Sequence, residues 1–151
     1  MTASTELVIG DENGQRVVIR ALSRNHPDLF DYWDANWVDC ELEIAAGGFR
    51  GAFRADLRSE EFQAFLEEAE GLSRTLDSAA SFSTMEGQLA FSLAGDASGH
   101  VRVQGEAVDT PGGDNRLQFS FAIDQTYLPG ICRALEVILA AFPVVGTADA
   151  S

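Results

Sequence analysis

Residues 37–58 alternate between apolar and charged or polar side chains, and this pattern constrains the fold more than any other feature of the sequence. Successive side chains of a strand point to opposite faces, so the pattern predicts strands that bury one face. The stretch "AAGG", which ends at residue 48, divides the run into the two arms of a hairpin. The residues predicted to face inward are Val38, Cys40, Leu42 and Ile44 on the first arm, and Phe49, Gly51, Phe53, Ala55 and Leu57 on the second.

The opposite face of this hairpin carries acidic residues on the first arm and Arg50, Arg54 and Arg58 on the second. Folding the arms together places Arg50 near Glu43 and Arg54 near Asp39. Opposite charges on neighbouring strands stabilise a sheet. We therefore interpret these side chains as pairs within the sheet and not as a catalytic cluster.

The remaining periodicity predicts an α+β fold for a single domain, 1–151. Asn13-Gly14 separates two apolar runs within 6–20 and predicts a hairpin with a type I′ turn. Ser59 is the predicted N-cap of an amphipathic helix over 59–76, and a second such helix, which Thr126 can cap, ends before Pro143. Four strand-like runs lie between the helices, at 80–85, 88–95, 100–109 and 116–124. The predicted architecture is an antiparallel β-sheet, made of hairpins plus a four-strand meander, with the two helices packed on one face.

Charge narrows the classes of function. The chain has 24 acidic and 10 basic residues, a formal net charge of −14, and no lysine. Schiff-base and P-loop lysine chemistry are therefore excluded, and such a charge disfavours nucleic-acid binding while favouring encounter with a basic macromolecule. The N-terminus lacks a signal-peptide pattern, and no apolar run is long enough to span a membrane, so we expect a cytoplasmic protein. In that compartment Cys40 and Cys132 should be buried and unbridged.

Catalytic motifs are missing from the sequence, so we expect neither an enzyme nor a cofactor. The most unusual stretch is "DYWDANWVD", residues 31–39. Two interpretations stay open: its rings and carboxylates contact a partner, or the tryptophans fill the core while the aspartates cap turns. A metal site formed with His26 is a weaker alternative, because its ligands lack a recognised spacing. The candidate partner-binding residues are Asp31, Tyr32, Trp33, Asp34, Asn36 and Trp37.

The strings "YWDANW" and "DQTYLP", within a similarity that runs from about residue 29 to 146, resemble the family of WapI-type immunity proteins. This resemblance implies a cytosolic antidote that binds a secreted bacterial toxin, often a nuclease, and blocks it. The expected partner is a basic toxin domain, to which an acidic protein is complementary. The alternative function is a stand-alone domain that binds a small molecule or a peptide in a pocket lined by some of the ten phenylalanines.

Overall fold

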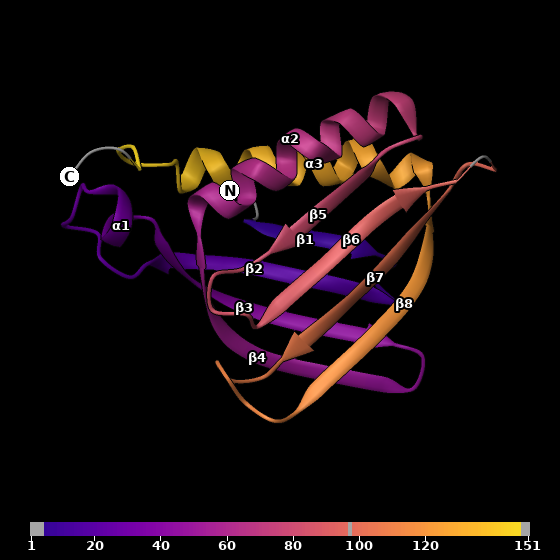
Figure 1. Cartoon of the computed structure of the whole chain (residues 1–151), viewed down its shortest axis with the longest axis horizontal. Helices are drawn as coiled ribbons and strands as arrows, with labels where there is room; N and C mark the ends of the chain where they lie inside the picture. Colours follow the sequence, from indigo (N-terminus) through magenta and orange to yellow (C-terminus); the bar gives the residue numbers. More distant parts are fainter. Residues whose placement is uncertain (1–4, 97, 149–151) are drawn as a thin grey trace.

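The computed structural model describes residues 5–96 and 98–148, and its elements form two successive units of four strands followed by a long helix (Figure 1). The short helix α1 lies inside the first unit. The elements are β1 (Glu6–Gly10), β2 (Arg16–Arg24), α1 (Tyr32–Ala35), β3 (Trp37–Ala46), β4 (Phe49–Arg58), α2 (Ser59–Thr75), β5 (Ala79–Ser83), β6 (Leu89–Gly95), β7 (His100–Val108), β8 (Arg116–Asp124), the 3₁₀ turn η1 (Gln125–Tyr127) and α3 (Leu128–Ala141).

The strands form two antiparallel four-stranded sheets, with orders β1-β2-β3-β4 and β5-β6-β7-β8. The expectation of one sheet is therefore corrected. Alternation along a strand identifies its buried face but does not identify the neighbouring strand, so it could not show that the sheet ends at β4. The two sheets cross in Figure 1, and α2 and α3 lie side by side along one end of them. Apolar side chains from both sheets and both long helices form one continuous core.

The first hairpin forms as predicted, but its turn is not type I′. Neither Asn13 nor Gly14 has a positive φ, and the left-handed position is Gly10, at φ 126°. The Asp11 carboxylate accepts a hydrogen bond from the Asn13 amide at 3.0 Å, and the Gly14 amide donates to the Asp11 carbonyl. The connection spans five residues, so an aspartate-centred turn and a glycine at the strand end replace the tight two-residue turn.

One of the two predicted cross-strand ion pairs is confirmed. Arg54 bonds Asp39, but Glu43 pairs with Arg16 and Arg20 of β2 instead of Arg50. The β3 strand has β2 as its other neighbour, and this strand supplies two arginines that the hairpin alone did not reveal. Hydrogen bonds from these guanidinium groups lower the pKa of Glu43.

The predicted inward and outward faces fail at both ends of β4. Phe49, predicted to face inward, is 69% exposed, whereas Arg58, predicted to face outward, is only 1% exposed. Arg58 is the last residue of the strand and also the N-cap of α2, a position predicted for Ser59. The Arg58 backbone is still extended, and its side chain is buried because α1 and the Trp37 ring cover it. The two cysteines, Cys40 and Cys132, are buried and free, as predicted.

Candidate partner-binding site

The predicted binding segment lies in and around α1, at one end of the molecule in Figure 1. Asp31 is the N-cap of this single helical turn, and its carboxylate accepts the Asp34 amide at 3.0 Å. An aspartate at this position satisfies an amide that has no partner inside the helix. The helix stops at Asn36, and β3 begins at the next residue. The structural interpretation of Asp31 as a turn cap is therefore confirmed.

The buried side chain of Arg58 holds this segment in place. Its Nη1 donates to the Trp33 carbonyl and its Nη2 to the Tyr32 carbonyl, each at 2.7 Å, while Nε bonds the Glu60 carboxylate. The guanidinium also lies 4.7 Å from the centre of the Trp37 ring and 5.5 Å from that of Tyr32. Buried charges persist when they are paired and hydrogen-bonded, and a planar guanidinium can stack on rings as well. Arg58 therefore holds α1 in position. This role could not be recognised from the alternating pattern, which placed Arg58 on the outer face of the strand.

Asn36 provides a second anchor and is fully buried. Its amide nitrogen donates to the carbonyls of Tyr32 and Val145, and its amide oxygen accepts the Val145 backbone amide at 2.8 Å. This paired interaction fixes the segment that follows α3 against α1. The partner residue is 109 positions away in the chain, so no local pattern indicates it.

The six candidate residues therefore divide by exposure. Asp31, Trp33 and Asp34 are exposed, Tyr32 and Trp37 are half-buried, and Asn36 is buried. Trp33 keeps 52% of its surface exposed although it packs edge-on against Tyr32. A partner has direct access to the first three side chains, whereas the others hold the segment in place.

Additional apolar groups lie exposed on the neighbouring loops, and the sequence analysis missed them. Leu29 and Phe30, just before α1, are 42% and 80% exposed, and Met85 in the β5–β6 turn is 58% exposed. The Glu61 carboxylate ties that turn to the start of α2, because it accepts the amides of both Arg58, at 2.8 Å, and Met85, at 2.6 Å. Exposed large apolar side chains that gather on one surface are typical of interaction sites. Burial raises the pKa of Glu61 to about 7, despite these two hydrogen bonds.

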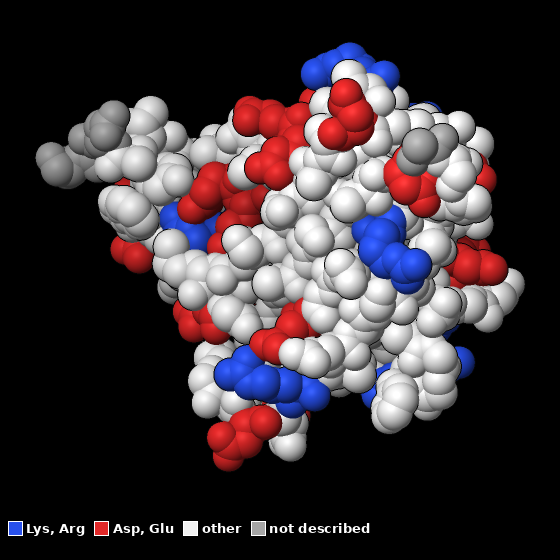
Figure 2. Space-filling view, turned by 45° about the vertical axis from the view of Figure 1, so that its right-hand side comes forward, with Lys and Arg blue, Asp and Glu red and all other residues white. Residues whose placement is uncertain are grey.

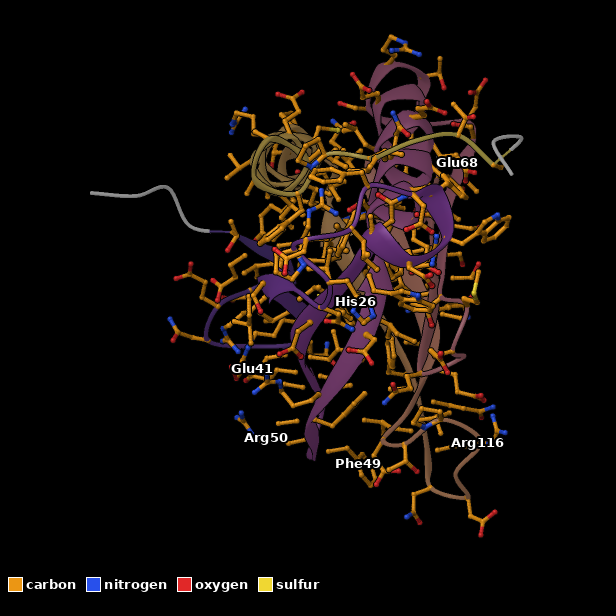
Figure 3. All side chains as sticks on the ribbon, turned by 90° about the vertical axis from the view of Figure 1, so that its left-hand side faces the viewer. His26, Glu41, Phe49, Arg50, Glu68 and Arg116 are labelled. Atoms are coloured by element: carbon orange, nitrogen blue, oxygen red, sulfur yellow. The ribbon has the colours of Figure 1, made fainter. Side chains whose placement is uncertain are left out.

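The surface beside this region is strongly acidic. Figure 2 shows carboxylates gathered over α2, whose sequence contains five glutamates and one arginine. One of them, Glu68, points from α2 toward β5 and is labelled in Figure 3. Of the other four, Glu67 and Glu70 are exposed, whereas Glu60 and Glu61 are half-buried. The acidic side chains of α2 are Glu60, Glu61, Glu67, Glu68 and Glu70.

The structure gives the two histidines no catalytic or metal-binding arrangement. His26 lies exposed on the loop before α1, as Figure 3 shows, and the exposed His100 shares a hydrogen bond with the Ser98 hydroxyl. The Asp96 carboxylate accepts from Ser98 and not from the imidazole, an order that differs from a Ser-His-Asp triad. Among residues 5–96 and 98–148, no three His, Cys, Asp or Glu side chains are grouped to hold a metal ion.

Several phenylalanines belong to the buried core. Phe62, Phe65, Phe82 and Phe91 pack against one another in the core, with ring centres 5.3 to 5.8 Å apart. A shallow hollow of about 260 Å³ lies at the far end of the sheets, beside the exposed Phe49. In the described part of the chain, no helix has the length and apolar character needed to cross a membrane.

Fold and surface together define an acidic, mainly antiparallel α+β protein with an exposed aromatic and carboxylate surface at one end. The chain belongs to the immunity protein WapI-like family, whose model matches residues 8–143. No curated protein matches it. A crystal structure of MRP1/MRP2 from Trypanosoma bruciei is similar, with 12% identity over 95% of this chain and 88% of that one and a TM-score of 0.49. A likeness this weak carries no argument about function.

Proposed function

We propose that this protein is an immunity protein that binds a cognate secreted bacterial toxin and neutralises it in the cytoplasm. Membership of the immunity protein WapI-like family over residues 8–143 is the observation that carries the proposal. The protein acts by occupying the toxin and has no reaction of its own. The proposal therefore involves three species that can be measured: the free toxin, the free immunity protein and the inhibited complex.

The proposed partner is a basic domain, such as a nuclease that needs positive charge to hold its substrate. A net charge of −14 supports this choice, because complementary potentials accelerate encounter and repel nucleic acid from the immunity protein itself. The start of α2 adjoins the segment, because Arg58 bonds both Glu60 and the carbonyls of Tyr32 and Trp33. A rigid aromatic ring with carboxylates around it fits an arginine- or lysine-rich surface.

The test is a binding measurement with the product of the adjacent gene, together with a nuclease assay of that product in which the protein is added or omitted. Asp31→Asn with Asp34→Asn removes two charges, and asparagine preserves the N-cap. We expect slower association with a weaker salt dependence, while the melting temperature stays near that of wild type. Trp33→Ala should reduce affinity at least about tenfold, as loss of an interfacial tryptophan does.

The matched control is Asp109→Asn with Asp114→Asn, which removes two charges from exposed residues of the β7–β8 loop. The β7–β8 loop and α1 lie in different parts of the molecule in Figure 1. Equal effects of the two double variants would show that only net charge matters and that α1 is not the contact. Absence of both binding and inhibition would refute the proposed function and favour a domain that binds a small molecule or a peptide.

A further inference from the structure

The two sheets have four edge strands, which differ in how their outward backbone groups are covered. An open edge exposes unpaired backbone groups, and proteins usually cover or block such edges. The β1 edge packs beside α3 and the β5 edge beside α2, where the Glu68 carboxylate accepts the outward Ser81 amide at 2.8 Å. On β4 the Gln88 side chain donates to the outward Arg54 carbonyl at 3.2 Å.

Within the described residues, no helix packs along the β8 edge and no side chain bonds its outward backbone groups. The Gln125 amide bonds the Gly99 carbonyl, which makes the odd-numbered residues of β8 the ones that bond β7. The backbone groups of Gln118, Ser120 and Ala122 therefore point away from the sheet, and no described residue bonds them. Their side chains are exposed, small or neutral, without the lysine or proline that blocks an edge.

Charge changes sign along this edge. Arg116 at its start is 56% exposed, and its Nη1 bonds Glu106, which leaves other guanidinium N–H groups for a further partner. Asp124 at its end uses one carboxylate oxygen for the Thr126 amide. Figure 3 shows Arg116 at the end of the molecule remote from the helices. An edge that is cationic at one end and anionic at the other complements a copy of itself in the antiparallel direction.

We propose that two copies of this chain associate through β8, in antiparallel register about Ser120, to form a continuous eight-stranded sheet. In this register Ser120 meets Ser120 of the second copy, and Gln118 meets Ala122, as hydrogen-bonded pairs that exchange two backbone bonds each. The same register places Arg116 beside Asp124 of the second copy, twice per dimer. The β8 edge lies apart from α1, so this dimer does not depend on the proposed function.

Sedimentation equilibrium of the full chain without any toxin, over a concentration series, tests the association directly. Wild-type protein should form dimers. Ser120→Pro removes an outward N–H without removing a bond to β7, and edge strands accept proline at such positions. We expect this variant to be monomeric and to keep its sheet content, while Ser120→Ala, which keeps the N–H, should remain dimeric. A monomeric wild type, or a dimeric proline variant, overturns the proposal.

A charge exchange tests the register. Arg116→Glu and Asp124→Arg each create two like-charge contacts per dimer and should each raise the dissociation constant at least about tenfold. In an equimolar mixture of the two variants, only the heterodimer has two attractive contacts, one between the two introduced charges and one between the two original charges. Recovery of dimers in the mixture supports the register. Mixed variants that stay monomeric while each remains folded by circular dichroism exclude it.

Discussion

Arg58→Ala is the most severe single truncation that we expect at the candidate site. The guanidinium is 1% exposed, donates to the Trp33 and Tyr32 carbonyls and bonds the Glu60 carboxylate. Alanine would leave the Trp33 carbonyl without its donor, whereas the Tyr32 carbonyl keeps the bond from Asn36. It would also remove the partner of the half-buried Glu60 carboxylate, whose Oε1 already lacks a hydrogen bond. Breaking a buried ion pair from one side costs about 3–5 kcal/mol of unfolding free energy. For a chain of this size that loss lowers the melting temperature by roughly 6–20 °C.

Urea unfolding followed by far-ultraviolet circular dichroism gives the unfolding free energy for this comparison. The matched control is Arg54→Ala, four residues earlier on the same strand. Arg54 also bonds a carboxylate, that of Asp39, but its side chain is 60% exposed. Water replaces the lost partner at an exposed pair, so Arg54→Ala should be close to wild type.

A second variant separates charge burial from loss of packing. Arg58→Met combined with Glu60→Gln fills similar space and leaves no unpaired charge. It should be more stable than Arg58→Ala, because removal of both charges avoids the desolvation penalty. An Arg58→Ala protein whose unfolding free energy lies within about 0.5 kcal/mol of wild type, the usual range for surface changes, would refute the anchoring role of Arg58. Equal losses for Arg58→Ala and Arg54→Ala would have the same meaning.

Three other measurements address the supporting groups. The pKa of Glu61 is about 7 in the folded protein, above its ordinary 4.5, so the folded state holds this proton more tightly and unfolding free energy should fall as pH rises between these values. Glu61→Gln should flatten that slope in urea titrations at several pH values. Thiol titration should detect Cys40 and Cys132 only after denaturation, since both are buried and free. Asn36→Ala removes three hydrogen bonds to Tyr32 and Val145, and hydrogen exchange should show faster exchange of the Val145 amide.

Element positions were largely predictable because the chain repeats local signals. The run 116–124 became β8 with the same bounds, and 59–76 became α2 to within one residue. Strand alternation and helical spacing both act over a few residues and identify a buried face. Sheet membership is a question of which strands meet, and the pattern within a strand does not answer it. The division into two sheets therefore had to come from the structure.

The candidate site was only partly predictable for the same reason. Asp31 as a cap is a local effect, and its partner Asp34 is three residues away. The Asn36 bonds to Val145 join the start of β3 to the segment after α3, and no periodicity encodes such a contact. Met85 reaches the site through Glu61, on a different element. The residue pattern thus indicated the unusual segment but not the groups that support it.

The "DYWDANWVD" segment is neither a fully packed loop nor a wholly exposed contact surface. Asn36 and the half-buried Trp37 meet the interior, where Arg58 binds the carbonyls of Tyr32 and Trp33. Those bonds orient the backbone of α1, and this orientation leaves the Trp33 ring 52% exposed. Holding a ring rigid before binding reduces the entropy lost on association. Under the proposed function, the buried members would contribute to partner affinity by positioning Trp33, and the exposed members by contact.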